Sequence, residues 1–221
     1  MTKIENIENT IINDDCINIL KQLPDKCIDV VLTDPPYGIG ESKRNNISRS
    51  NLAKAKDYGN KDWDITIPDK VIFDEMFRVS KNQIIFGGNY FVKYLDNSPC
   101  WIVWNKDNGN NDFADCELAW TNFKTAVRKY DWRWQGMLQQ NMKNKDIRIH
   151  PTQKPLGLIE KILLDYSKEN DLVLDCFSGS GTTAVACYNT NRRFICIEKD
   201  KEYYEKSKER LNEIKSQIRL F

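Results

Sequence analysis

A strand, a glycine-bearing turn and the start of a helix follow one another between residues 171 and 187, and this order strongly constrains the fold. Asp171–Asp175 has the pattern of a buried strand, Cys176–Thr183 is the turn, and the apolar stretch 184–187 begins a helix. Glycines let the backbone approach a ligand closely, and the amino end of a helix favours an anionic group. The segment therefore predicts an α/β fold with a ligand-binding loop after a strand.

A second short apolar strand, Arg193–Ile197, ends in Glu198. This acid follows the glycines by about 20 residues, the spacing at which a carboxylate meets ribose hydroxyls in doubly wound folds. A solvated charge after a strand is the alternative interpretation of Glu198. The loop has neither the Gly-Lys-Ser/Thr of a phosphate-binding loop nor the full glycine pattern of dinucleotide enzymes, so a cofactor with a ribose and a small charged tail fits better.

The tetrad Asp34-Pro35-Pro36-Tyr37 follows a further apolar run, residues 28–33. Its carboxylate can accept a hydrogen bond from an exocyclic amine, and the stiff Pro-Pro pair aims a backbone carbonyl at the same amine. The tyrosine ring offers a stacking face for a base taken out of its helix. A strand followed by a rigid turn with a solvated aspartate is the alternative that these residues leave open.

Apolar runs and helical patterns alternate along the chain. The expected strands are Thr10–Asn13, 28–33, Gln83–Phe86, Trp101–Trp104, Glu117–Thr121, Asp171–Asp175 and Arg193–Ile197. The expected helices are Cys16–Leu23, Pro68–Ser80, Asn89–Leu95, Pro155–Ser167 and Lys201–Ile218, with another beginning at Ala184. This alternation predicts a mostly parallel sheet covered by helices on both faces.

The tetrad, together with the Asp-x-Phe-x-Gly-Ser-Gly-Thr-Thr pattern that starts at Asp175, resembles the DNA methyltransferases that methylate amino groups with S-adenosylmethionine. The segment His150–Pro155 looks like the cofactor-capping motif of that family, and the motif order is similar to its permuted β group. Matching segments run from about Asn13 to Lys201. One departure is Cys176, which stands where the family commonly has proline. It should matter little, because a backbone loop holds the ligand.

The resemblance implies a Rossmann-like class I methyltransferase fold, with a mostly parallel seven-stranded sheet and a circularly permuted motif order. It implies S-adenosylmethionine as the cofactor and double-stranded DNA as the substrate. The length of 221 residues agrees with a single catalytic domain over residues 1–221.

The cofactor-binding residues that we expect are Asp15, Thr152, Lys154, Asp175, Phe177, Ser178, Gly179, Ser180, Gly181, Thr182 and Glu198. The resemblance puts Thr152 and Lys154 beside the methionine carboxylate; an ordinary helix entry is the alternative. Asp15 is equally an acid near the adenine of the cofactor or a helix N-cap. Phe177 lines the cofactor site or fills the core, and a charge such as Asp175 at the mouth of a buried strand needs a reason.

The resemblance also implies the reaction, which is transfer of a methyl group to the N6 amino group of a flipped adenine. The catalytic residues are then Asp34, Pro35, Pro36 and Tyr37. Members that methylate cytosine often carry serine in place of the tetrad aspartate, so Asp34 favours adenine. N4-cytosine methylation is the runner-up, followed by RNA methylation and an inactive relic that binds only cofactor or DNA.

The net charge of +1 gives no global positive field, so any contact with DNA must come from local patches. One candidate is the polar loop 41–62, with Lys43, Arg44 and Arg49. The other is a short target-recognition segment at about 123–148, where Arg128 and Arg133 lie among aromatic residues. A solvated loop and a small hydrophobic hairpin are equally good interpretations of these segments.

The remaining expectations come from composition and context. The 7 cysteines include no Cys-x-x-Cys pair, and the sequence has no signal peptide and no membrane-length apolar run. This indicates a reduced, cytoplasmic protein. The single histidine, His150, cannot anchor a histidine-rich metal site, so no metal is expected. A homodimer is expected from the family resemblance only, and a cognate restriction endonuclease leaves no mark in this sequence.

Overall fold

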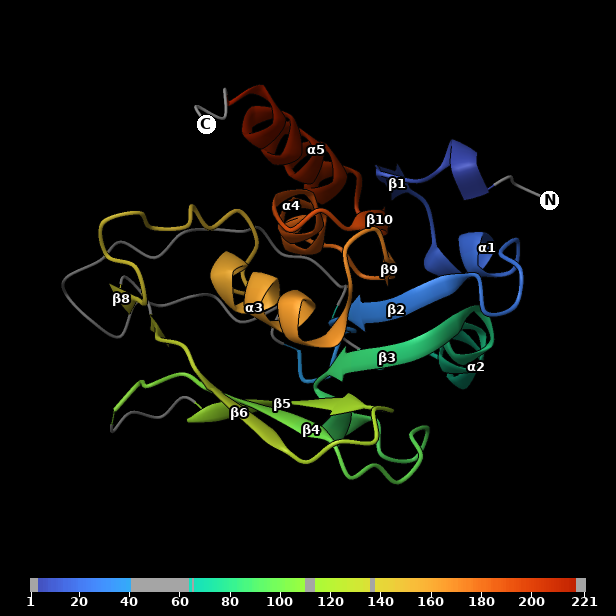
Figure 1. Ribbon diagram of the computed structural model, residues 1–221, viewed down its shortest axis with the longest axis horizontal. Helices are drawn as coiled ribbons and strands as arrows, with labels where there is room; N and C mark the ends of the chain where they lie inside the picture. The colour runs from blue at the N-terminus through green and yellow to red at the C-terminus, as the bar shows by residue number, and fades with distance from the viewer. Residues whose placement is uncertain (1–3, 41–63, 65, 110–113, 136–137, 218–221) are drawn as a thin grey trace.

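A computed structural model describes residues 4–40, 64, 66–109, 114–135 and 138–217, and within them an eight-stranded sheet forms the centre of the molecule. Its strands are β1 (Thr10–Asn13), β2 (Ile28–Thr33), β3 (Ser80–Phe86), β4 (Trp101–Asn105), β5 (Cys116–Thr121), β6 (Arg128–Asp131), β9 (Leu172–Asp175) and β10 (Arg193–Glu198). The spatial order is β1-β10-β9-β2-β3-β5-β4-β6 (Figure 1). Only β5 pairs antiparallel with its neighbours among these described strands.

Helices cover both faces of this sheet, as the sequence predicts. They are α1 (Cys16–Leu20), α2 (Lys70–Val79), α3 (Leu156–Tyr166), α4 (Thr182–Asn189) and α5 (Lys201–Ser216). Along the centre of β2, Val30 and Leu32 pack with α3, α4 and α5, whereas Val31 between them packs with α1 and α2. This period of two is what a strand buried on both faces requires. No helix in the described part of the chain is long and apolar enough to span a bilayer.

The sheet has one strand more than the seven expected, because residues 128–131 pair in parallel with β4. In the sequence this run falls within the expected recognition segment at about 123–148. Its pattern is weak, since Tyr130 is the one buried residue among exposed neighbours. The Tyr130 hydroxyl donates a 2.7 Å hydrogen bond to Asp165 of α3. A polar run is typical of an edge strand, which exposes one side to water.

Other boundaries differ by a few residues. The expected helix Asn89–Leu95 is a short 3-10 turn, η3 (Gly88–Tyr90), and a second one, η1 (Ile4–Asn6), precedes β1. A two-stranded hairpin of β7 (Trp134–Gln135) and β8 (Leu138–Gln139) follows β6.

The topology brings the predicted motifs to one edge of the sheet. Strands β2, β9 and β10 are parallel neighbours, so their carboxyl ends lie together. The tetrad follows β2, the glycine loop follows β9, and Glu198 ends β10. Ligands of open α/β sheets bind outside the carboxyl ends of strands, so this edge is where a site is expected.

Candidate active site

A cavity of about 620 Å³ opens at this edge, a volume typical of small-molecule sites. The tetrad, the glycine loop, the segment before α3 and the end of β10 all contribute to its wall. The predicted site residues that line it are Asp15, Asp34, Pro36, Thr152, Lys154, Asp175, Phe177, Ser178, Gly179, Ser180, Thr182 and Glu198. Pro35, Tyr37 and Gly181 are close in sequence but are not part of the lining.

The glycine loop is fastened at several points. Gly179 and Gly181 have φ angles of 51° and 71°, in the left-handed region that favours glycine. The Gly179 N–H donates a 2.7 Å hydrogen bond to the Glu198 carboxylate. A Cβ atom at Gly181 would lie 2.8 Å from Cβ of Ser207, so α5 packs directly on the loop. Gly181 therefore lacks a side chain because α5 packs against the back of the loop, and not because a ligand approaches it.

Glu198 is held by backbone groups on both of its oxygens, since the Asp200 N–H also donates to it at 2.7 Å. Burial raises the pKa of Glu198, opposed by these two hydrogen bonds. The interpretation of Glu198 as a merely solvated charge is wrong: the residue lines the cavity at the end of its strand. Its carboxylate retains lone pairs, which can accept hydrogen bonds from ligand hydroxyls.

Asp175 has a structural reason for its buried charge. Its carboxylate accepts hydrogen bonds from the hydroxyls of Thr33 at 2.8 Å and Thr183 at 2.7 Å, and from the Phe177 N–H at 3.1 Å. Burial raises the pKa of Asp175 to about 6, with these hydrogen bonds opposing the shift. Asp175 thus ties the end of β2, the glycine loop and α4 together beside the cavity.

Both interpretations of Asp15 agree with the structure. Asp15 caps α1, because its side chain accepts a 3.2 Å hydrogen bond from the Ile17 N–H. It also lines the cavity and forms a 2.8 Å ion pair with Lys199.

The tetrad carboxylate is not a solvated turn residue. Oδ1 of Asp34 accepts a 2.6 Å hydrogen bond from the Tyr37 hydroxyl, and Oδ2 pairs with the ammonium of Lys154. Burial raises the pKa of Asp34, and the charge of Lys154 opposes that shift. A carboxylate has about four lone-pair sites, so Asp34 retains capacity to accept a hydrogen bond from an amine.

The ring of Tyr37 differs from the open stacking face that the sequence predicts. Tyr90 stacks on it, with ring centroids 4.7 Å apart and an interplanar angle of 14°. Gly87 lies against the same ring, since a Cβ atom there would be 2.1 Å from Cε1 of Tyr37. In this conformation the Tyr37 hydroxyl orients Asp34. A base that stacks on the face of Tyr37 now covered by Tyr90 has to displace Tyr90.

Lys154 also has other partners than the methionine carboxylate expected from the resemblance. Its Nζ lies against Asp34 and is 3.2 Å from Oε2 of Glu117, and its side chain is 9% exposed. Burial alone would lower the pKa of Lys154; the two carboxylates outweigh burial and raise it. The charge of Lys154 is therefore directed at the tetrad.

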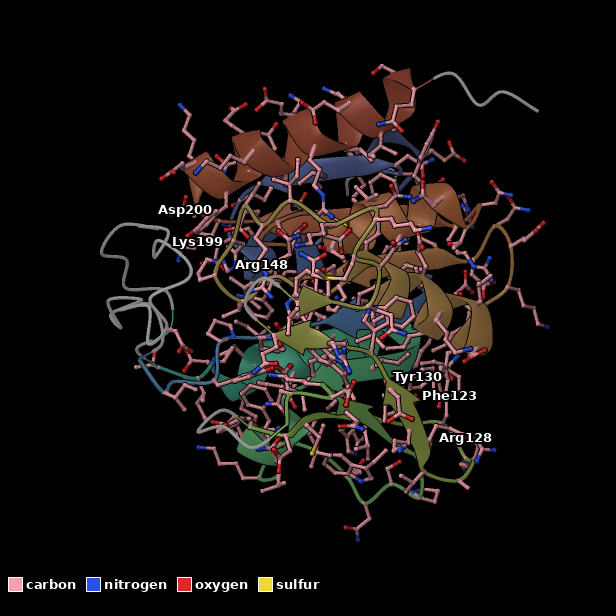
Figure 2. All side chains as sticks on the ribbon, turned by 90° about the vertical axis from the view of Figure 1, so that its left-hand side faces the viewer. Phe123, Arg128, Tyr130, Arg148, Lys199 and Asp200 are labelled. Atoms are coloured by element: carbon pink, nitrogen blue, oxygen red, sulfur yellow. The ribbon has the colours of Figure 1, made fainter. Side chains whose placement is uncertain are left out.

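The five basic residues predicted to contact DNA either lie outside the described residues or do not line the cavity. Lys43, Arg44 and Arg49 lie outside the described residues. Figure 2 shows Arg128 beside Phe123 and Tyr130, away from Lys199 and Asp200 of the cavity wall. The Arg133 guanidinium forms a 2.9 Å hydrogen bond with Asp107. Neither Arg128 nor Arg133 lines the cavity.

Two residues in or next to the site, His150 and Glu117, were not among the predicted site residues. His150 lines the cavity, touches the Thr152 hydroxyl at 3.1 Å and packs edge-on against Tyr203, with ring centroids 4.2 Å apart. Its position at the start of the capping motif was the available signal. Glu117 gave a fainter one, as a lone carboxylate in an apolar strand. Among the described residues, no group of three or more His, Cys, Asp or Glu side chains is placed to hold a metal ion.

Three known proteins illustrate what this chain is similar to. It is 29% identical to Type II methyltransferase M.HinfI of Haemophilus influenzae, over 96% of this chain and 70% of the relative. It is 30% identical to Type II methyltransferase M.HpaI of Haemophilus parainfluenzae, over 93% of this chain and 75% of the relative. The crystal structure of the M1.HpyAVI–SAM complex superposes with a TM-score of 0.56 at 26% identity, covering 92% of this chain and 98% of that one.

Fold and site together define a Rossmann-like methyltransferase that depends on S-adenosylmethionine. A family model described as DNA methylase, of the N6/N4 type, matches residues 68–209. The chain belongs to this family of DNA methyltransferases.

The residues present fit the cofactor. The glycine loop brings backbone close to the cavity, and the carboxylates of Asp15 and Glu198 stand in its wall. The buried Ser178 hydroxyl, also in the wall, has no hydrogen-bond partner among the described residues. A buried polar group without a partner is costly, so a polar ligand at this point is expected to satisfy it.

Proposed function

We propose that this enzyme methylates the N6 amino group of an adenine flipped out of double-stranded DNA. The observation that carries the proposal is the position of Asp34, a carboxylate in the wall of the cavity that the glycine loop also lines. S-adenosylmethionine supplies an electrophilic methyl group on its sulfonium. The task left for the protein is to make a weak nucleophile, the adenine amine, attack it.

Asp34 and the Pro35 carbonyl are suited to this task. Hydrogen bonds from the amine to these two acceptors favour a pyramidal nitrogen whose lone pair faces the methyl group. Asp34 also stabilises the positive charge that develops on nitrogen, which is catalysis by positioning and electrostatics. The proton that the alkylated nitrogen releases passes to Asp34 or to water.

The choice of adenine rests on Asp34 itself, because serine is frequent at this position in family members that act on cytosine. An aspartate places a full negative charge beside the amine, whereas a serine hydroxyl offers a neutral acceptor.

For DNA contact we propose the loop 41–62 and the segment that follows β6, up to residue 148. The segment has hairpin β7–β8, exposed Lys143 and Lys145, and Arg148, which stacks on Trp134 at 4.2 Å. Basic side chains interleaved with aromatic rings suit a nucleic-acid backbone and its bases. The chain then works as a single catalytic domain that carries a short recognition segment.

We further propose a homodimer acting in the cytoplasm. The dimer is an inference from family membership, and sedimentation that gives a monomer at working concentration would remove it. The location is supported by the 7 cysteines, which are all unpaired in the structure, as is typical of proteins in a reducing compartment.

Asp34→Asn tests the role of the carboxylate. The matched control is Asp29→Asn, because Asp29 lies in β2, the strand that the tetrad follows, and is paired with a lysine as Asp34 is. The Asp29 side chain is 22% exposed, against 21% for Asp34. We expect Asp34→Asn to bind S-adenosylmethionine with nearly unchanged affinity by calorimetry. Methyl transfer to DNA should fall by about a hundredfold or more, while Asp29→Asn stays active. Loss of cofactor binding in Asp34→Asn would contradict the assignment.

A further inference from the structure

A row of alternating charges runs from the tetrad into the sheet. Asp34 pairs with Lys154, Lys154 lies 3.2 Å from Glu117 of β5, and Glu117 lies 2.6 Å from Lys106, just after β4. None of the four side chains is more than 21% exposed. Asp34 and Lys154 line the cavity, whereas Glu117 and Lys106 stand behind them.

Stability does not account for this row. Taking charges out of water is expensive, and a buried ion pair is often no more stable than well-packed apolar residues of similar size. Glu117 is the second residue of β5, opposite Trp104 in the register of β4 and β5, and the apolar residues Leu118, Ala119 and Trp120 follow it. A carboxylate held there at such a cost points to a function for its charge.

The sharing of one ammonium by two carboxylates suggests what that function is. If Lys154 had Asp34 as its single partner, its charge would be fully neutralised by the carboxylate that has to bind the amine. Glu117 draws part of that interaction away. Asp34 then keeps more of its negative charge available for the N–H groups of the amine.

We propose that Glu117 is a positioning residue for methyl transfer, which holds Lys154 between the two carboxylates and so keeps Asp34 a competent acceptor. The inference rests on the proposed role of Asp34 as the group that receives the amine hydrogen bond. Lys106 completes the row by anchoring Glu117 from the far side.

The charges around Asp34 also affect how readily it takes up a proton. The groups that face it are Tyr37 of its own segment, Lys154, Glu117 and Asp175. Burial and the charge of Glu117 raise the pKa of Asp34, against the effect of Lys154. The pKa of Glu117 is lowered, because the two lysines outweigh its burial. The charge of Glu117 therefore makes Asp34 easier to protonate.

Glu117→Gln tests this by removing the charge and keeping the shape. We expect kcat to fall about tenfold, with little change in KM for S-adenosylmethionine or DNA. The acidic limb of the kcat profile should move to lower pH by about one unit, because a negative charge near Asp34 is lost. Glu117→Asp keeps the charge, so its kcat and the position of its acidic limb should be close to those of wild type. Lys106→Met removes a positive charge and should move the limb the opposite way.

Glu8→Gln is the matched control, since Glu8 has a side-chain exposure of 18% and a 2.7 Å ion pair with Arg193, remote from the tetrad in the fold. It should leave the profile unchanged. An acidic limb that stays in place in Glu117→Gln and Lys106→Met would overturn the inference, as would equal losses in Glu117→Gln and Glu117→Asp. If Glu117→Gln does not fold, the Lys106→Met and Glu117→Asp profiles decide. Wild-type enzyme that methylates no DNA base refutes the proposed function instead.

Discussion

Replacing Gly87 with alanine should disturb the tetrad from behind, without touching the cavity. Gly87 follows β3 with a φ angle of 66°, and its N–H donates a 2.8 Å hydrogen bond to the Leu118 carbonyl. A Cβ atom there would lie 2.1 Å from Cε1 and 2.6 Å from Cζ of Tyr37. Backbone hydrogen bonding holds Gly87 in place, so the tyrosine ring has to move.

The unfolding free energy that Gly87→Ala should lose has two parts, which can be measured separately. An alanine in the left-handed conformation costs about 1–2 kcal/mol by itself. Displacing the ring also weakens its stack with Tyr90, worth about 0.5–1.5 kcal/mol, and its hydrogen bond to the Asp34 carboxylate, worth about 1.5–3 kcal/mol. Gly109 provides the control: its φ angle is 64°, and a Cβ atom there would meet nothing within 4 Å. Gly109→Ala should therefore show the backbone cost alone.

Urea unfolding followed by tryptophan fluorescence measures both variants under the same conditions. Gly87→Ala should lose about 2–4 kcal/mol more unfolding free energy than Gly109→Ala. It should also lose methyl transfer, because the Tyr37 hydroxyl no longer orients Asp34. Equal stabilities and equal activities of the two variants would refute the account of Tyr37 as a residue locked between Gly87, Tyr90 and Asp34.

Two further predictions concern the supports of the glycine loop. Asp175 has its pKa raised from 3.8 to about 6 in the folded protein, so it stabilises the fold below pH 4, and this contribution is lost as the pH rises through 6. The free energy of unfolding, measured from pH 4 to 7, should therefore fall in wild type relative to Asp175→Asn by up to about 3 kcal/mol. Parallel pH dependences of the two proteins would contradict the buried charge. Gly181→Ala should cost about 2–3 kcal/mol, and Ser207→Gly in the same chain should recover part of it. A double-mutant cycle without coupling between these two sites would show that α5 does not press on the loop.

The parts of the site that sequence predicts well are those defined by local pattern and one topological rule. Asp34, the glycine loop and Glu198 each follow a short apolar strand, and parallel strands end at one edge. Their meeting in one cavity follows from these two facts. The same reasoning finds the helix-capping role of Asp15, because an N-cap depends on neighbours two or three residues away.

Contacts between side chains of distant segments could not be predicted from local sequence patterns. Lys154 and Asp34 are 120 residues apart, and the pairing of Lys154 with Asp34 and Glu117 depends on how the segment before α3 lies across the sheet. Tyr90 covers Tyr37 because η3 folds back beside the tetrad, which no periodicity reveals. The edge strand β6 was not predicted for a different reason. Tyr130 is its one buried residue, so its sequence pattern resembles that of a loop.

We propose that the half-buried Asp34 carboxylate directs methyl transfer to adenine. Incubation of the wild-type enzyme with methyl-labelled S-adenosylmethionine and unmodified mixed-sequence DNA, followed by nucleoside analysis of the digest, tests it most directly. We expect label in N6-methyldeoxyadenosine, and none in DNA treated with Asp34→Asn. Label in N4-methyldeoxycytidine, or an Asp34→Asn variant as active as wild type, would contradict it.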